Sequence, residues 1–238
     1  MKYLLLCLFL TISAFIQPIG NGFAKKESLC INVVYHCIYW TKYDIAIKAI
    51  AIDNIGMIHQ NLNEAFEDRI YFDPAPIVMY HKDLLTLPML YNDLVFNGGS
   101  YYRQLVEHYT IPGYYNVFIL PNSICEESGL LGFTPLNLIT PTDIQDASPL
   151  FDNAFVSYEG LMEYDNGSTL IHETGHFFGL EHTFELDSLE KNNMGLRSVF
   201  DVCVNYMSYG CFLSQFTPEQ LDYMVEFFKN NRKYLLKE

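Results

Sequence analysis

Apolar and polar positions follow two different periods along this chain, and these periods predict its helices and strands. Between residues 51 and 65 the apolar positions Ala51, Ile55, Ile58, Leu62 and Ala65 recur at steps of four and three, as on one face of a helix. Residues 31–40 are β-branched and aromatic, which is typical of a buried strand. Further short strands are expected at residues 77–80, 115–120 and 154–158.

The remaining pattern indicates one long loop and one C-terminal helix. Residues 121–152 are rich in Pro, Ser, Thr, Asn and Asp, so we expect a long surface excursion there. Thr217 is placed to cap a helix, Pro218 takes its first position, and Gln220 completes a capping box. Strand, helix, several strands and then helices describe an α/β sandwich of moderate size.

Composition and charge narrow the classes of partner. The chain has 238 residues, of which 50% are hydrophobic and 18% charged, so one globular unit is expected. Lys and Arg total 14 against 28 for Asp and Glu, which gives a net charge of −14 at pH 7. Binding to nucleic acid or to anionic lipid needs clustered cations, so we expect neither partner.

The first residues have the three parts of a secretory signal. Met1 and Lys2 precede Tyr3–Ile16, a stretch without charge that ends shortly before Pro18. A membrane span needs about 20 apolar residues, more than this stretch supplies. We therefore expect a signal peptide at residues 1–24, and a mature protein that is secreted or periplasmic.

Five cysteines follow the expected cleavage site: Cys30, Cys37, Cys125, Cys203 and Cys211. An oxidising compartment permits disulfides, although the odd number leaves at least one thiol over. Cys30 and Cys37 bracket a strand that separates them by roughly 23 Å, whereas a disulfide tolerates about 7 Å between Cα atoms, so these two should not pair. Cys203 and Cys211 flank an expected tight turn and are the best candidate bridge. The pairing of Cys125 stays open.

One short segment has the spacing of a metal site. His172 and His176 are four residues apart, so on a helix they lie one above the other and can share an ion. Glu173 is on the same helix, where it reaches a metal-bound water without being a ligand. Gly179 can adopt a positive φ and end the helix, so that His182 turns back towards the same ion.

This donor set points to a catalytic zinc ion. Three neutral imidazoles leave a tetrahedral Zn²⁺ one open position for water. The alternative is a helix whose histidines merely pack or face water. The added Gly179 and His182 weigh strongly against that alternative.

The segment resembles the metzincin clan of zinc endopeptidases, whose motif is met at His172, Glu173, His176, Gly179 and His182. A turn carrying a methionine beneath the metal is a second clan feature, and residues 205–209 with Met207 fit it. The sequence also resembles the pappalysin family within that clan. The resemblance lies in the segments 179–184, 205–209 and 216–220 and in the positions of Cys203 and Cys211. The motif-bearing resemblance covers roughly residues 154–221.

The resemblance implies a fold and a division of the chain. A metzincin-like α/β (α+β) fold has a twisted mixed β-sheet, a backing helix and an active-site helix, followed by a small C-terminal subdomain that ends in a helix. The catalytic domain is expected at residues 25–238, with an upper subdomain at about 25–179 and a lower subdomain at about 180–238.

The implied activity is that of a secreted zinc endopeptidase acting on protein or peptide substrates. Glu173 is expected to act as general base and then as general acid. Tyr209 lies where the resemblance places a tyrosine that hydrogen-bonds the oxyanion; a structural hydroxyl in the turn is an equal alternative. From its order in the chain, the strand at 154–158 is expected to form the upper rim of the cleft and to pair with an extended substrate.

Several alternatives remain at this stage. Calcium sites found in some relatives would need ligands such as Asp187, Glu190 and Asp201, but scattered acids are usually solvated and the segment is short for the family. A protein of this fold that binds zinc without catalysis is one rival function, against which Glu173 speaks. A zinc exopeptidase or amidase is another.

Overall fold

The structure is a computed structural model, and the residues it describes are 28–39, 45–74, 77–81, 86–97, 99–121, 129–135, 152–158, 161, 167–210 and 213–237. The signal peptide expected at residues 1–24 lies outside this part of the chain, as do Cys125 and Cys211. In the described residues, no helix has the length and apolar character needed to cross a membrane.

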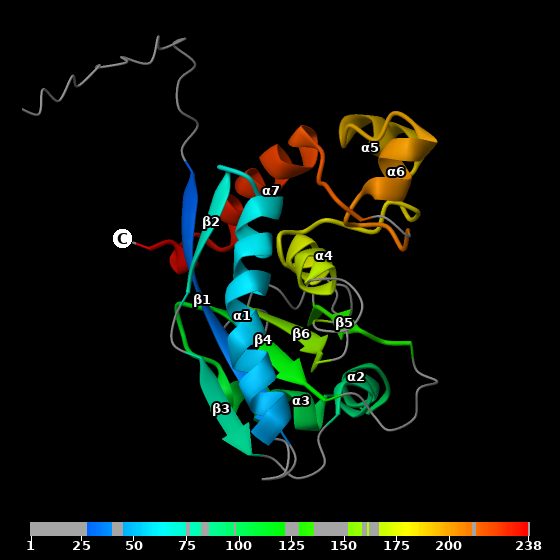
Figure 1. Cartoon of the computed structure of the whole chain (residues 1–238). Helices are drawn as coiled ribbons and strands as arrows, with labels where there is room; N and C mark the ends of the chain where they lie inside the picture. The colour runs from blue at the N-terminus through cyan, green and yellow to red at the C-terminus, as the bar shows by residue number, and fades with distance from the viewer. Residues whose placement is uncertain are drawn as a thin grey trace, which may run out of the picture.

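A twisted six-stranded sheet forms the centre of the fold (Figure 1). Four strands run parallel in the order β2-β1-β4-β6, and β5 is added antiparallel to β6. The long strand β1 pairs with β2 along its first half and with β3 along its second half. The strands are β1 (Leu29–Tyr39), β2 (Ile70–Pro74), β3 (Val78–His81), β4 (Tyr115–Leu120), β5 (Gly132–Phe133) and β6 (Asn153–Ser157). This is the mixed sheet expected from the sequence.

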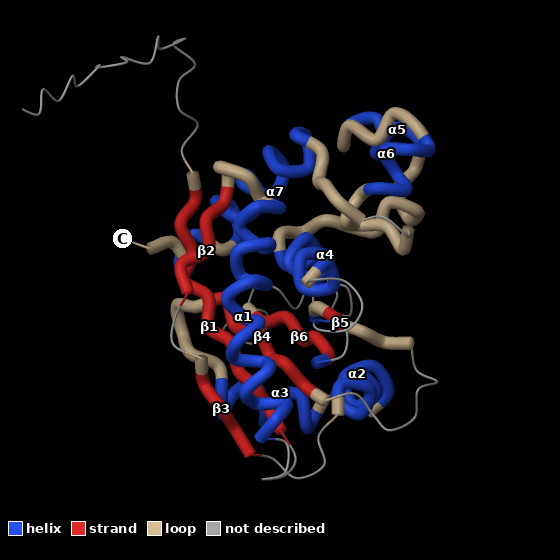
Figure 2. Tube along the Cα trace, viewed as in Figure 1, coloured by secondary structure: helices blue, strands red, loops and turns tan. Residues whose placement is uncertain are grey.

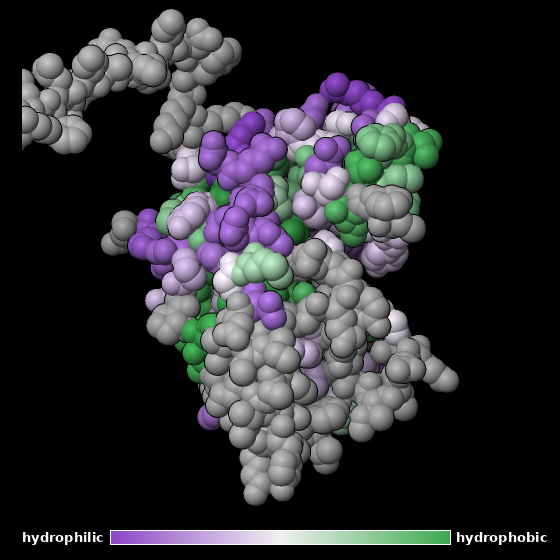
Figure 3. All heavy atoms as spheres, in the orientation of Figure 1, coloured by the Kyte–Doolittle hydropathy of each residue, from purple (hydrophilic) through white to green (hydrophobic). Residues whose placement is uncertain are grey.

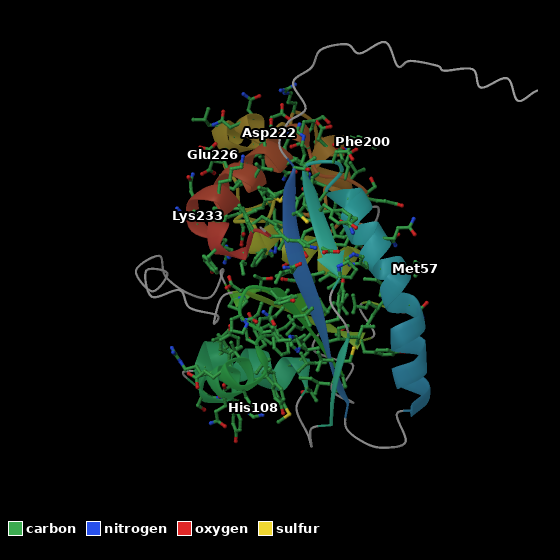
Figure 4. The ribbon with its side chains drawn as sticks, turned by 90° about the vertical axis from the view of Figure 1, so that its left-hand side faces the viewer. Met57, His108, Phe200, Asp222, Glu226 and Lys233 are labelled. Atoms are coloured by element: carbon green, nitrogen blue, oxygen red, sulfur yellow. The ribbon has the colours of Figure 1, made fainter. Side chains whose placement is uncertain are left out.

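Helices cover both faces of the sheet. Helix α1 (Ile45–Ala65) lies on one face, and α2 (Leu87–Phe96) and α3 (Ser100–Tyr109) lie on the other. Figure 4 shows Met57 of α1 and His108 of α3 directed outwards on opposite sides of the strands. The sheet is therefore enclosed as the middle layer of an α/β sandwich.

Alternation along the strands divides the interior into two cores. In β4, Val117 and Ile119 belong to the core beneath α1, whereas Phe118 and Leu120 belong to the core beneath α2 and α3. The first core extends to α4 (Ser168–Phe177), which carries His172 and His176, and to α7 (Pro218–Asn231). Because α4 contributes to this core, the segment that carries the histidines is fixed against the sheet.

The C-terminal part of the chain contains two short helices, α5 (Ser188–Asn193) and α6 (Val199–Val204), followed by α7 and the 3₁₀ turn η5 (Lys233–Leu235) (Figure 2). Helix α5 buries no residue and α6 buries only one. Apolar side chains gather on the surface over these helices (Figure 3), and Leu189, Val199 and Phe200 are exposed there. Their ends are instead stabilised by capping boxes.

Those capping boxes use the acids considered above as calcium ligands. Asp187 accepts from the backbone N–H groups of Leu189 and Glu190, while the Glu190 carboxylate accepts from the N–H of Asp187. Asp201 accepts from the backbone N–H of Ser198. These carboxylates cap helices, and they do not converge on a cation.

Most elements expected from periodicity are confirmed: β1, α1, β3, β4, β6 and α7 with its capping box. The expectation of a long surface excursion at residues 121–152 was wrong in one part, because β5 lies within it and Phe133 and Thr134 are buried. Residues 122–128 and 136–151 of this range lie outside the described part of the chain. Strand β2 and helices α2 and α3 were not expected.

The thiols do not support the expected bridge. Cys203 is free and exposed, and its expected partner Cys211 lies outside the described residues. Cys30 and Cys37 are free as well and lie along β1, in agreement with the argument from strand length.

Candidate metal centre

Helix α4 carries the metal motif and is buried along most of its length. Every residue from Thr169 to Phe177 is buried. The helix begins after Gly167 at φ +93° and is followed by Gly179 at φ +84°. An added Cβ at Gly179 would also lie 2.6 Å from the Phe227 ring. The chain therefore turns sharply at a position that requires glycine, and His182 comes back towards the helix.

Three histidine nitrogens converge beyond α4. The Nε2 atom of His176 lies 3.2 Å from that of His172 and 3.0 Å from that of His182. The potential ligand atoms of all three side chains lie within 4.8 Å of one another. Among the described residues this is the only group of three or more His, Cys, Asp or Glu side chains that could hold a metal ion.

The other ring nitrogen of each histidine faces an oxygen acceptor. His172 Nδ1 donates to the Tyr206 carbonyl at 2.6 Å, and His176 Nδ1 donates to the Leu180 carbonyl at 2.7 Å. His182 Nδ1 lies 3.0 Å from Oε2 of Glu185. A carbonyl oxygen and an ionised carboxylate only accept, so these contacts place the proton of each ring on Nδ1 and leave the Nε2 lone pairs for the cluster.

This arrangement fits a zinc ion. Nitrogen ligands at 2.0–2.1 Å from a tetrahedral ion are separated by about 3.3 Å, close to the spacings found here. Burial and the neighbouring His172 and His182 rings lower the pKa of His176 well below its usual value, which keeps that ligand neutral. Hydrogen bonds from Nδ1 to protein oxygens are the usual support of zinc-bound histidines.

Glu173 is buried beside the histidines. Its Oε2 atom finds no hydrogen-bond partner among the described residues. Burial raises the pKa of Glu173 to about 8. A cation held by the histidines would oppose this shift, because a nearby positive charge favours the carboxylate. A buried carboxyl oxygen without a partner next to a cation-binding cluster is suited to exchange a proton with a water molecule.

The edge strand β5 lies directly against Glu173. A Cβ atom added at Gly132 would lie 2.9 Å from Glu173 Cγ and 3.0 Å from its Oε1 atom. The hydroxyl of Thr134 donates to the Glu173 carbonyl at 2.8 Å. The expected role of residues 154–158 as the rim was wrong, because β6 is paired on both sides, with β4 and β5. The strand next to the site is β5.

Tyr209, which follows helix α6 in the chain, lies at the same cluster of histidines. Its hydroxyl donates to His182 Nε2 at 3.0 Å, and its ring stacks on that of His172. Partial burial raises the pKa of Tyr209, and the negative charges of Glu173 and Glu185 add to the shift. The phenol is therefore protonated at neutral pH and can act as a hydrogen-bond donor.

Met207 is fully buried in the turn that precedes Tyr209. A Cβ atom added at Gly175, on the zinc-site helix, would lie 2.4 Å from the Met207 sulfur. The Met207 carbonyl accepts from the Thr183 N–H at 2.9 Å. Helix α4, the His182 segment and the methionine turn are thus in direct contact.

The chain is similar to known proteins over the segment that carries this geometry. The family model described as pregnancy-associated plasma protein-A, Peptidase_M43, matches residues 103–202, which include the three histidines and Glu173. This match supports a metzincin metallopeptidase of pappalysin-like family.

One solved structure shows a similar fold. Mature mirolysin of Tannerella forsythia, solved with a cleaved peptide, superposes with a TM-score of 0.59 at 18% identity, and the match covers 88% of this chain and 95% of that one. A structure described as a chaperone–substrate complex gives a TM-score of 0.46 at 14% identity, covering 87% of this chain and 35% of that one. No curated protein sequence matches the chain.

The structure of this pappalysin-like chain adds residues that the sequence did not single out. They are Gly132 and Thr134 on or beside β5, Gly175 above Met207, and Glu185 beside His182. Asn205 also belongs here, since its side chain accepts from the Met207 N–H at 3.0 Å. Their contacts depend on tertiary structure, apart from those between His182 and Glu185 and between Asn205 and Met207, which are close in the sequence.

Proposed function

We propose that this metallopeptidase is a secreted, zinc-dependent endopeptidase that hydrolyses internal peptide bonds, with His172, His176 and His182 as its metal ligands. The observation that carries the proposal is the convergence of three Nε2 atoms whose Nδ1 atoms are all engaged, next to a buried Glu173 oxygen without a partner. When bound, Zn²⁺ supplies Lewis acidity, which lowers the pKa of water towards about 7 and polarises a carbonyl.

The protein's own groups supply the proton transfers. Glu173 accepts a proton from the attacking water at its free Oε2 atom and then delivers it to the leaving amine, acting as base and then acid. The Tyr209 hydroxyl, already a donor to His182, is placed to donate to the oxyanion of the scissile carbonyl.

An extended substrate would lie along β5. This strand pairs only with β6 in the described part of the chain, so its other edge is available for main-chain hydrogen bonds. Gly132 lets this edge approach Glu173 closely. Binding as an added strand accommodates the middle of a polypeptide, which favours endopeptidase action over exopeptidase or amidase action.

The test uses an internally quenched peptide blocked at both ends and the zinc-loaded protein. We expect the wild type to cut it and Glu173→Gln to bind zinc equally without cutting. Glu226→Gln on the exposed face of α7, far from the histidines in the chain, is the charge-matched control and should cut normally (Figure 4).

Other outcomes would reject parts of the proposal. If both proteins bind zinc and neither cuts, the chain binds metal without turnover. Cleavage of peptides with free ends but not of blocked ones would make it an exopeptidase. Equal activity of Glu173→Gln would exclude Glu173 as the base.

A further inference from the structure

The third histidine of the cluster is held differently from the other two. His172 and His176 lie on the buried helix α4, and their Nδ1 atoms donate to main-chain carbonyls. His182 follows the glycine turn, outside any helix, and its Nδ1 atom faces a side-chain carboxylate, that of Glu185, at 3.0 Å. A hydrogen bond to a carboxylate is stronger than one to a neutral carbonyl, and it brings a negative charge to the site.

A tight turn builds this contact. The N–H of Glu185 donates to the His182 carbonyl at 3.0 Å, which closes the chain over three residues. The same Oε2 atom that faces the imidazole also lies 3.3 Å from the backbone nitrogen of His182. One carboxylate oxygen therefore binds both the backbone and the ring of a single residue, and it fixes the direction of the ring.

Further contacts hold the backbone and plane of His182 without specifying which ring nitrogen is protonated. Thr183 next to it donates to the Met207 carbonyl, and the Phe184 ring stacks on the imidazole at 4.8 Å between centroids. Neither contact involves a polar atom of the ring. The Glu185 carboxylate is the acceptor at Nδ1 and the Tyr209 hydroxyl donates to Nε2, so both favour the tautomer whose Nε2 lone pair faces the cluster, and Glu185 is the group that holds the Nδ1 proton.

We propose that Glu185 is a positioning residue of the metal centre. Its carboxylate holds His182 in the tautomer and orientation that present Nε2, and its charge makes this imidazole a stronger donor to a cation. The inference rests on the proposed role of the three histidines as metal ligands. Loss of such a supporting carboxylate typically lowers metal affinity about 10- to 100-fold.

The test compares Glu185→Ala, which removes the acceptor, with Glu185→Gln, which keeps an acceptor but removes the charge. Glu181→Gln is the matched control, because Glu181 is an exposed acid beside His182 in the same segment. Zinc affinity is measured by competition with a chromophoric chelator. Nitrogen-15 shifts of the His182 ring in the metal-free protein report its tautomer directly.

We expect Glu185→Ala to bind zinc about 10- to 100-fold more weakly. Its His182 ring should show more of the Nε2-protonated tautomer than the wild type, in which the proton is held at Nδ1. Glu185→Gln should retain the single tautomer and lose a smaller part of the affinity, and Glu181→Gln should match the wild type. The Glu185 side chain is 51% exposed, so the metal-free variants should unfold at nearly the wild-type temperature.

Unchanged zinc affinity in Glu185→Ala, or an unchanged His182 tautomer in that variant, would overturn the inference. Neither measurement depends on peptide cleavage. A protein that binds zinc and cuts nothing would reject the proposed endopeptidase activity, while a drop in the affinity of Glu185→Ala would still support the role of Glu185. If removal of a histidine abolishes zinc binding and Glu185→Ala leaves it unchanged, the role proposed for Glu185 is rejected and the role of the histidines as ligands stands.

Discussion

Asn205 and Gln220 pair their side-chain amides in both directions. Asn205 Nδ2 donates to Gln220 Oε1 at 2.6 Å, and Gln220 Nε2 donates to Asn205 Oδ1 at 3.2 Å. Asn205 Oδ1 also accepts from the N–H of Met207, and Gln220 Oε1 from that of Thr217. The buried pair thus joins the methionine turn beneath the metal centre to the first turn of α7.

Replacing Gln220 with Ala should therefore affect both ends of this link. The Asn205 amide and the Thr217 N–H would each lose a partner in a buried environment, and an unsatisfied buried polar group costs about 1–3 kcal/mol. We expect a loss of about 2–3 kcal/mol in the free energy of unfolding, read from urea titration of the metal-free protein. Asn230→Ala, an exposed amide on the same helix, should change little, and an equal loss there would reject the explanation.

A pair of glycines tests the contact between α4 and the methionine turn. At Gly175 an added Cβ would meet the Met207 sulfur at 2.4 Å, whereas nothing lies within 4 Å of a Cβ at Gly56 in α1. Gly175→Ala should destabilise by about 1–3 kcal/mol through overpacking and weaken zinc binding. Gly56→Ala should stabilise by about 0.5–1 kcal/mol, since alanine favours the helix. Thermal unfolding of both variants checks the two signs, and stabilisation of Gly175→Ala would show that Met207 moves freely.

The metal motif could be predicted because its geometry is local. A four-residue step on a helix puts His172 and His176 on one face whatever surrounds them, and a glycine followed by His182 indicates the turn. The Asn205–Gln220 pair spans 15 residues and two elements, so no periodicity marks it. Tertiary structure alone determines which amides meet.

The elements that were missed have broken or short patterns. In α2 the third buried position is Asp93, whose carboxylate accepts from the backbone N–H groups of Tyr101 and Tyr102 at the start of α3. A polar residue in the buried stripe conceals the helix from a hydrophobic period. Strand β5 has only two residues, too few for any alternation to be seen, and its place at the rim follows from pairing with β6.

A buried ion pair fastens the C-terminal segment to the end of α4. Arg232 lies 3.3 Å from Asp152 at the start of β6, donates to the Phe177 carbonyl at 2.8 Å, and covers the Phe177 ring at 4.4 Å. Tyr234 donates to the same carboxylate. The two charged side chains are only 5% and 4% exposed. The segment that follows α7 therefore contacts both the sheet and helix α4.

Arg232→Met should destabilise the protein strongly. The change leaves Asp152 buried without its cation, and breaking a buried pair in this way costs about 3–5 kcal/mol. The exposed pair Arg197–Glu219 provides the control, and Arg197→Met should cost no more than about 1 kcal/mol. Urea unfolding of the metal-free variants measures both. Equal, small losses would mean that Asp152 is readily accommodated as a neutral acid.

His36 gives the fold a defined sensitivity to acid. It is fully buried, its Nε2 atom lies 2.8 Å from Asn116 Oδ1, and its ring stacks on Phe118. Burial lowers the pKa of His36 to about 4, against 6.5 for an exposed histidine. Between these two values the unfolded chain binds a proton that the folded protein does not, so stability falls as the pH is lowered through this window.

The loss attributable to His36 at pH 5 is about 2 kcal/mol, from 1.36 kcal/mol for each pH unit below 6.5. His36→Gln keeps a polar partner for Asn116 and removes the titrating ring. We expect the variant to be less stable than the wild type at pH 7.5, and the difference to shrink by about 2 kcal/mol at pH 5. Urea unfolding of both metal-free proteins at the two pH values measures this, because groups common to both cancel. If the difference in the free energy of unfolding between the two proteins is the same at both pH values, the folded protein protonates His36 as readily as the unfolded chain does.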